Sequence, residues 1–177
     1  MYITGINPTQ SQTNAQGPAF RLGTHGAVVQ APGLYTAPMS ETGTTAGAFD
    51  GSKVFVYVQA TSTITAGQAV VVDYANAAVP LAASLADSTG KRVAVATADI
   101  AATGYGWVQV FGKANVNVIA STAVGGAVSS SATAGSLGDL TAGTTHRPVT
   151  GLHIGAVNST TGSVFLNWPE LGAAFSA

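Results

Sequence analysis

The sequence predicts an all-β protein: a single compact antiparallel β-barrel or β-sandwich domain with an extended N-terminal arm. Three observations lead to this fold class. The 177 residues include 26 Val and Ile but only 11 Leu and Met, so the β-branched aliphatic residues outnumber the large helix-forming ones. The chain also contains 22 Gly and 22 Thr, and Gly-containing turns separate its short β-branched runs. The length fits one domain.

Residues 1–50 differ from the rest of the chain and are expected to form an extended arm and loops. Four of the seven prolines lie in this range. Each proline lacks a donor for a β-ladder and favours extended geometry in the residue before it. The range also contains many large apolar residues, too many for a flexible linker, so the arm should pack on another surface. The barrel or sandwich domain is assigned to residues 51–177.

The first clear strand covers residues 54–58, where every position is apolar, so both faces of this strand should be buried. Further strands are predicted from the same enrichment in β-branched and aromatic residues at 69–73, 92–96, 107–111, 114–119, 152–157 and 163–168. Gly112 and Lys113 separate two of these strands and fit a type II′ turn. The sequence therefore predicts a hairpin at this point.

Two parts of the strand region resemble each other. Residues 62–70 (STITAGQAV) are similar to residues 121–128 (STAVGGAV), and the strands that follow each of them also match, at an offset of about 57–59 residues. This similarity suggests two similar β-units fused into one barrel or sandwich. The alternative is chance similarity within a sequence dominated by Ala, Gly, Thr and Val.

The charge content excludes several classes of function. Only 6 Lys and Arg and 7 Asp and Glu are present, 7% of the residues, and the net charge is −1; soluble domains average about 25%. The chain lacks the cations that would neutralise a nucleic-acid backbone, and it has no run of about 18 apolar residues for a membrane helix. It has no cysteine. Its N-terminus resembles no secretion signal, so synthesis in a cytoplasm is expected.

The sequence contains no catalytic constellation. Its acidic residues are isolated, and most lie beside turn residues, where Asp usually bonds to the local backbone. No Gly-x-Ser-x-Gly motif occurs. The one metal hypothesis combines Asp139, His146 and His153, whose spacing matches no known zinc pattern. We therefore predict a protein that is not an enzyme and has no cofactor and no metal site.

The low charge instead indicates a surface that partners cover. A free monomer usually carries a mixed, charged surface, whereas interface cores are depleted of Lys, Glu and Asp. The aromatic and large apolar residues of the arm, together with one Arg, are candidates for contacts with such partners. These candidate residues are Tyr2, Ile6, Phe20, Arg21, Leu22, Tyr35 and Met39.

Several blocks of the sequence resemble the capsid decoration, or cement, proteins of tailed bacteriophages. The blocks are DGSKVFVYVQA (50–60), TAGQAV (65–70), GYGWVQVFG (104–112) and VFLNWP (164–169). In addition, FRLGT (20–24) is similar to the segment that precedes the first strand in this family. Residues 25–49 depart from the family pattern, because this chain carries extra residues there.

The resemblance implies a non-enzymatic virion protein that is made in the host cytoplasm and binds the outer surface of an assembled capsid. Its implied partners are the major capsid protein, whose neighbouring copies it holds together against internal DNA pressure, and itself, commonly as a homotrimer. No direct contact with nucleic acid or membrane is implied. The alternative is a host- or carbohydrate-binding β-domain of a phage fibre or surface protein, with its site around residues 104–107 and Asn158.

Overall fold

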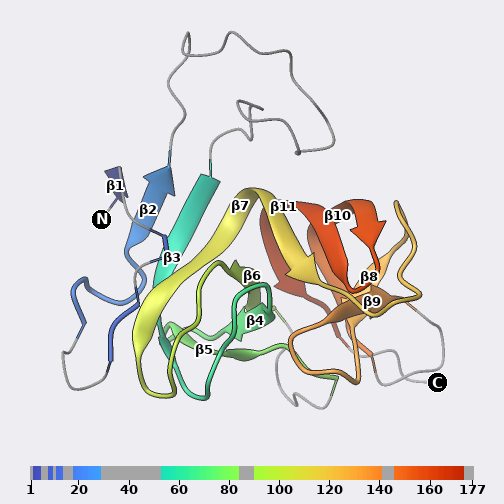
Figure 1. Cartoon of the computed structure of the whole chain (residues 1–177). Coiled ribbons are helices and arrows are strands. Elements are labelled where there is room, and N and C mark those ends of the chain that lie inside the picture. Colours follow the sequence, from blue (N-terminus) through green and yellow to red (C-terminus); the bar gives the residue numbers. More distant parts are fainter. Residues whose placement is uncertain are drawn as a thin grey trace, which may run out of the picture.

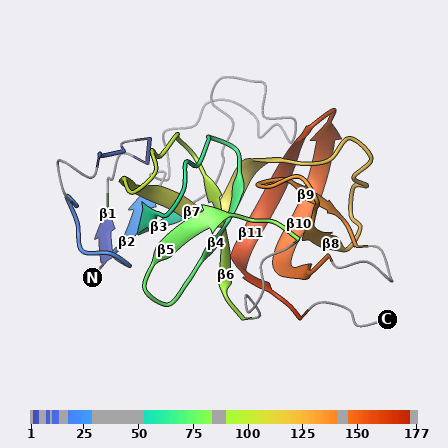
Figure 2. The same cartoon turned by 90° about the horizontal axis from the view of Figure 1, so that it is seen from below.

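The computed structural model describes residues 2–4, 8–9, 11–13, 18–28, 53–83, 90–140 and 146–173. These residues form strands and no helix, which confirms the predicted all-β class (Figures 1 and 2). All the strands belong to one sheet. They are β1 (Tyr2–Thr4), β2 (His25–Val28), β3 (Lys53–Ala60), β4 (Ala69–Val72), β5 (Ala77–Pro80), β6 (Arg92–Ala96), β7 (Tyr105–Asn117), β8 (Val128–Ser130), β9 (Leu137–Asp139), β10 (Pro148–Asn158) and β11 (Thr161–Leu171). Within this part of the chain, no helix could span a membrane.

Five strands close into a first ring. Strand β3 pairs with β5, β5 with β4, β4 with β6, β6 with β7, and β7 again with β3; only the β3–β5 pairing is parallel. Side chains alternate between the two faces of a strand, so every second residue points into the ring. These inward residues are small and aliphatic: Val54, Val56, Val58, Ala60, Val70, Val72, Ala78, Ala94, Ala96, Val108 and Val110.

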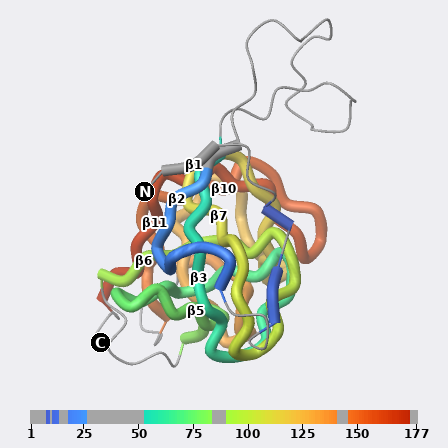
Figure 3. Tube along the Cα trace, turned by 90° about the vertical axis from the view of Figure 1, so that its left-hand side faces the viewer, coloured from blue at the N-terminus to red at the C-terminus, as the bar shows by residue number. Residues whose placement is uncertain are grey.

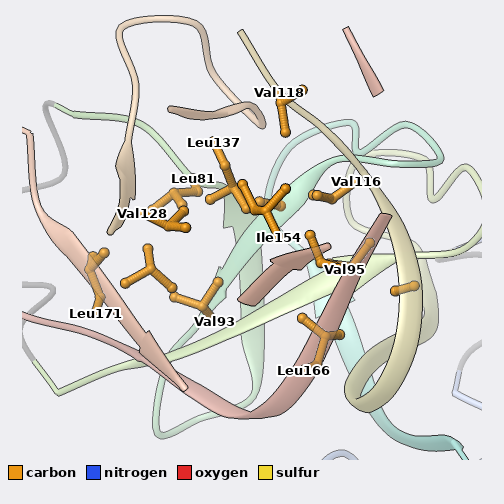
Figure 4. Close-up of a cluster of buried hydrophobic side chains, with 14 of the residues drawn as sticks. Leu81, Val93, Val95, Val116, Val118, Val128, Leu137, Ile154, Leu166 and Leu171 are labelled. Atoms are coloured by element: carbon orange, nitrogen blue, oxygen red, sulfur yellow. The ribbon is translucent and has the colours of Figure 1, made fainter. Parts of the chain in front are cut away.

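A second ring repeats this arrangement. Strand β7 pairs with β11, β11 with β10, β10 with β8 and β8 with β9, all antiparallel. A parallel bridge between Val118 and Leu137 then connects β9 to the end of β7. The core of this ring includes Val116, Val128, Leu137, Ile154, Val164 and Leu166. Figure 4 shows Val116, Leu137 and Ile154 among the side chains of this core.

The two rings have the same strand order and the same parallel closure, so the sequence similarity corresponds to a structural repeat. Strands β3, β5, β4, β6 and β7 of the first ring correspond to β7, β9, β8, β10 and β11 of the second. Equivalent hydrogen bonds recur 58 residues apart: Gly67 N donates to Ala96 O at 2.8 Å, and Gly125 N donates to Ile154 O at 3.0 Å. Both glycines have a positive φ, 83° and 75°.

Strand β7 is shared by both rings, and the predicted hairpin at Gly112 is wrong. Residues 105–117 form one continuous strand. In a hairpin the two halves would pair with each other, whereas the first half pairs with β3 and the second half, from Phe111, pairs with β11. Gly112 has a φ of 91°, a conformation that glycine adopts without strain. Gly112 therefore allows an irregularity inside one continuous strand and does not form a chain reversal.

Strands with two buried faces separate the packed layers. In β4, Val70 faces the first core and Val71 faces the second, and β6 alternates in the same way. Strand β3 turns alternate residues into the first core and places Phe55 and Tyr57 in a separate cluster on the outside of the ring. This confirms the prediction that residues 54–58 are covered on both sides.

The described N-terminal residues extend the sheet and cover the first ring. Strand β1 pairs in parallel with β2, and β2 pairs antiparallel with β3; Figure 3 shows β2 beside β3. After residue 28, the chain up to residue 52 lies outside the described residues. The predicted domain boundary at residue 50 falls in that range. What is described of the predicted arm therefore includes two short strands.

Candidate interaction surface

The structure describes four of the seven residues predicted to contact partners. Ile6, Tyr35 and Met39 lie outside the described residues, and of Tyr2 only the position in β1 is described. The other three are consecutive: Phe20 and Leu22 are half-buried, and Arg21 between them is exposed. This segment therefore presents a charged side chain to solvent and packs two apolar side chains against its own domain.

Phe20 covers two aromatic residues on the outside of the first ring. Its ring centroid lies 5.3 Å from that of Tyr57, edge to face, and 5.3 Å from that of Trp107. The Tyr57 hydroxyl donates to Gln12 Oε1 at 2.9 Å and accepts from Ala19 N at 3.2 Å. Burial raises the pKa of Tyr57, so its phenol keeps the proton that it donates. Phe20 and Leu22, which were predicted to contact a partner, thus pack against aromatic residues of the same chain.

This cover changes the site expected for a carbohydrate-binding domain. Trp107 is only 2% exposed, and Tyr105 is half-buried and stacked on Tyr57 with ring centroids 6.4 Å apart. Asn158 is exposed at the end of β10. Trp107 is therefore too buried to contribute to the carbohydrate site considered at residues 104–107.

The structure provides no support for the metal hypothesis. Among the described residues, no group of three or more His, Cys, Asp or Glu side chains could hold a metal ion. Asp139 instead accepts a hydrogen bond from Ala123 N at 2.8 Å. Ala123 lies 16 residues before Asp139 in the chain, so this contact is not the local turn hydrogen bond expected for Asp139.

Strand β11 exposes two aromatic side chains. Phe165 is 49% exposed and Trp168 is 42% exposed. Phe165 makes a T-shaped contact with Phe111 of β7, with ring centroids 5.6 Å apart. Trp168 meets His25 edge to face at 5.6 Å, and the guanidinium of Arg92 lies 5.8 Å from its ring centroid.

An irregularity in β11 sets the position of Trp168. Its φ is 51°, a left-handed conformation that is uncommon for an aromatic residue and costs on the order of 1–3 kcal/mol. Trp168 lies opposite a register shift in β10, where Gly151 also has a positive φ.

His25, which contacts Trp168, has a lowered pKa. Burial and the nearby Arg92 lower this pKa, so His25 is neutral near pH 7.

An open groove of about 430 Å³ lies beside Phe165 on the outer face of the second ring. Strand pairing places Lys113, Phe165 and His153 side by side across β7, β11 and β10. Gly155 leaves the groove open, because an added Cβ would meet only the carbonyl of Ser163, at 3.8 Å. The lining residues are Lys113, His153, Gly155, Ala156, Ser163, Val164 and Phe165, and none is acidic.

Comparison with known proteins assigns no family to the chain. No family model matches the sequence, and no curated protein matches it significantly.

Proposed function

We propose that the chain is a capsid decoration protein, a structural virion component that binds the outer surface of an assembled phage capsid and cements neighbouring major capsid proteins. The observation that carries this proposal is the exposure of two aromatic side chains on β11, Phe165 and Trp168, in a chain with only 7% charged residues. Interface cores are enriched in aromatic residues and poor in Lys, Glu and Asp. The blocks that resemble the decoration family include strand β3 and most of β7 and β11.

In this proposal the mechanism is multivalent clamping without catalysis or a cofactor. Each copy makes modest contacts with the major capsid protein, and three copies around a symmetry axis act together by avidity. Arg21, exposed on the N-terminal segment, adds a charged contact with a capsid carboxylate. The protein functions at the outer capsid surface and touches neither the packaged DNA nor a membrane.

The test uses capsids of the virus whose genome encodes the chain, prepared without this protein. The purified chain is mixed with these capsids, and binding is followed by co-sedimentation and cryo-EM. We expect saturable binding, added density on the outer surface, and greater resistance of the capsid to heating. The heat-denatured chain is the control for nonspecific sedimentation. A chain that leaves capsids undecorated at micromolar concentration would refute the proposal.

A host- or carbohydrate-binding β-domain is the second candidate. The observation in its favour is the groove at Phe165, where an exposed aromatic ring lies beside the polar side chains of Ser163 and His153. Ligand sites commonly combine an apolar wall with a few polar groups. Binding to a glycan array that is lost in Phe165→Ala, together with no affinity for capsids, would select this function over capsid decoration.

A further inference from the structure

We propose that the groove beside Phe165 binds a short apolar segment of the major capsid protein, as the first ring binds residues 18–22 of the chain itself. This inference rests on the proposed function, and it adds the docking site and the form of the partner. It follows from the internal repeat, from the exposure of Phe165 and from the chemistry of the groove.

The first ring shows how this fold covers the outer face of such a ring. Tyr57 on β3 and Trp107 on β7 are each only 2% exposed, because the segment that bears Phe20 lies over them. Backbone hydrogen bonds on both sides of this segment hold the chain to the ring: Gly23 N donates to Tyr57 O at 2.8 Å, and Gln12 N donates to Tyr105 O at 2.7 Å. A short segment of bends and a turn, with the two apolar side chains of Phe20 and Leu22, thus covers this outer face.

The corresponding face of the second ring carries no such cover among the described residues. Phe55 pairs with Gln109 across β3 and β7, and Lys113 pairs with Phe165 across β7 and β11. Because β3 and β7 of the first ring correspond to β7 and β11 of the second, these two pairs occupy equivalent places. Phe165 remains 49% exposed there. A partner chain would supply the segment that the N-terminal residues supply to the first ring.

The groove indicates the chemistry of that segment. Gly155, Ala156 and Val164 form a small, apolar lining beside the Phe165 ring, which suits one large apolar side chain. The two titratable residues of the lining, Lys113 and His153, are both basic, and the lining contains no carboxylate. Charge complementarity therefore favours a partner segment that carries an acidic residue next to its apolar side chain.

Two variants test the groove by different means. Gly155→Val fills the groove. The fold tolerates a side chain at this position, because the φ of Gly155 is not positive and an added Cβ makes only an ordinary contact. The matched control is Gly126→Val, at a glycine outside the groove lining where an added Cβ would also make only ordinary contacts, the nearest at 3.8 Å. Phe165→Ala removes the aromatic ring, and Tyr74→Ala is its control, because Tyr74 is 87% exposed on another surface.

Binding of each variant to undecorated capsids is measured by co-sedimentation, with thermal melting to verify folding. We expect Gly155→Val and Phe165→Ala to bind about tenfold more weakly than the parent, a loss typical of a central contact residue. Both controls should bind like the parent. A cryo-EM map of decorated capsids should show a capsid segment running beside β11.

The outcomes separate this inference from the function on which it rests. If the parent chain does not bind capsids, the proposed function fails and the inference fails with it. If the parent binds and both folded groove variants bind equally well, or the groove is empty in the map, only the inference is overturned. If the groove variants change the oligomeric state of the isolated protein, as measured by analytical ultracentrifugation, the groove binds a second copy of the chain. The inference that it binds a capsid segment is then wrong.

Discussion

Replacing Phe20 by Ala should destabilise the folded protein by about 2 kcal/mol. Full burial of a Phe side chain contributes roughly 1.5–3 kcal/mol, and a well-oriented aromatic pair adds about 0.5–1.5 kcal/mol. Phe20 is half-buried and contacts two rings, those of Tyr57 and Trp107. Its partial exposure lowers the burial contribution to roughly half, about 0.75–1.5 kcal/mol, and the aromatic contribution brings the total to about 2 kcal/mol.

Urea denaturation followed by tryptophan fluorescence measures this change. The chain has two tryptophans, and Trp107 is the buried one, directly beneath Phe20. A Trp168→Phe background leaves Trp107 as the single reporter. For a urea dependence of about 2 kcal/mol/M, the midpoint should fall by about 1 M. The emission of folded Phe20→Ala should also shift to the red, because water reaches Trp107.

Phe165→Ala, in the same background, is the matched control. It makes the same chemical change at a side chain that is 49% exposed, so its cost should stay below about 1 kcal/mol. If Phe20→Ala costs no more than Phe165→Ala, or if Trp107 emission is unchanged, the N-terminal segment does not cover the first ring. The first ring would then no longer support the proposal that a segment covers the groove on the second ring.

Three further predictions concern the repeat, pH and the arm. Gly125→Ala should cost about 1 kcal/mol from its positive φ alone, whereas Gly67→Ala should cost more, since its added Cβ would lie 2.8 Å from Asn117 Oδ1; equal melting temperatures would contradict this. Because the pKa of His25 is lowered on folding, only the unfolded chain takes up this proton as pH falls below about 6.5, so stability should decrease there. The decrease should be smaller in His25→Gln, as melting curves from pH 7.5 to 5 will show. Arg21→Glu, at an exposed position, should weaken capsid co-sedimentation without changing the melting temperature, and unchanged binding would remove Arg21 from the contact.

Strand positions were readable from the sequence because they depend on local composition. The prediction for residues 92–96 matches β6 at both ends, and residues 54–58 lie within β3. The pairing was not readable, because it depends on contacts between distant segments. A glycine with a positive φ suits both a two-residue turn and a bend inside a strand, so Gly112 alone could not distinguish a hairpin from one long strand.

The candidate site was predictable in part for the same reason. Val164 and Leu166 alternate with Phe165 along β11, so the pattern could have indicated that Phe165 points outward. Trp168 could not be placed in this way, because the irregularity at its own position interrupts the alternation. For Phe20, composition indicated only that the arm needs an apolar partner. It did not distinguish the surface of another protein from the chain's own β3 and β7.

The sharing of β7 has a consequence for how the protein unfolds. Since this strand is a wall of both rings, removing it leaves each ring open along one side and exposes both cores to water. Local opening of one repeat therefore cannot occur without disturbing the other, unlike in a chain of independent modules. The two repeats should melt in one cooperative transition, and the amide protons of β7 should be among the last to exchange with solvent.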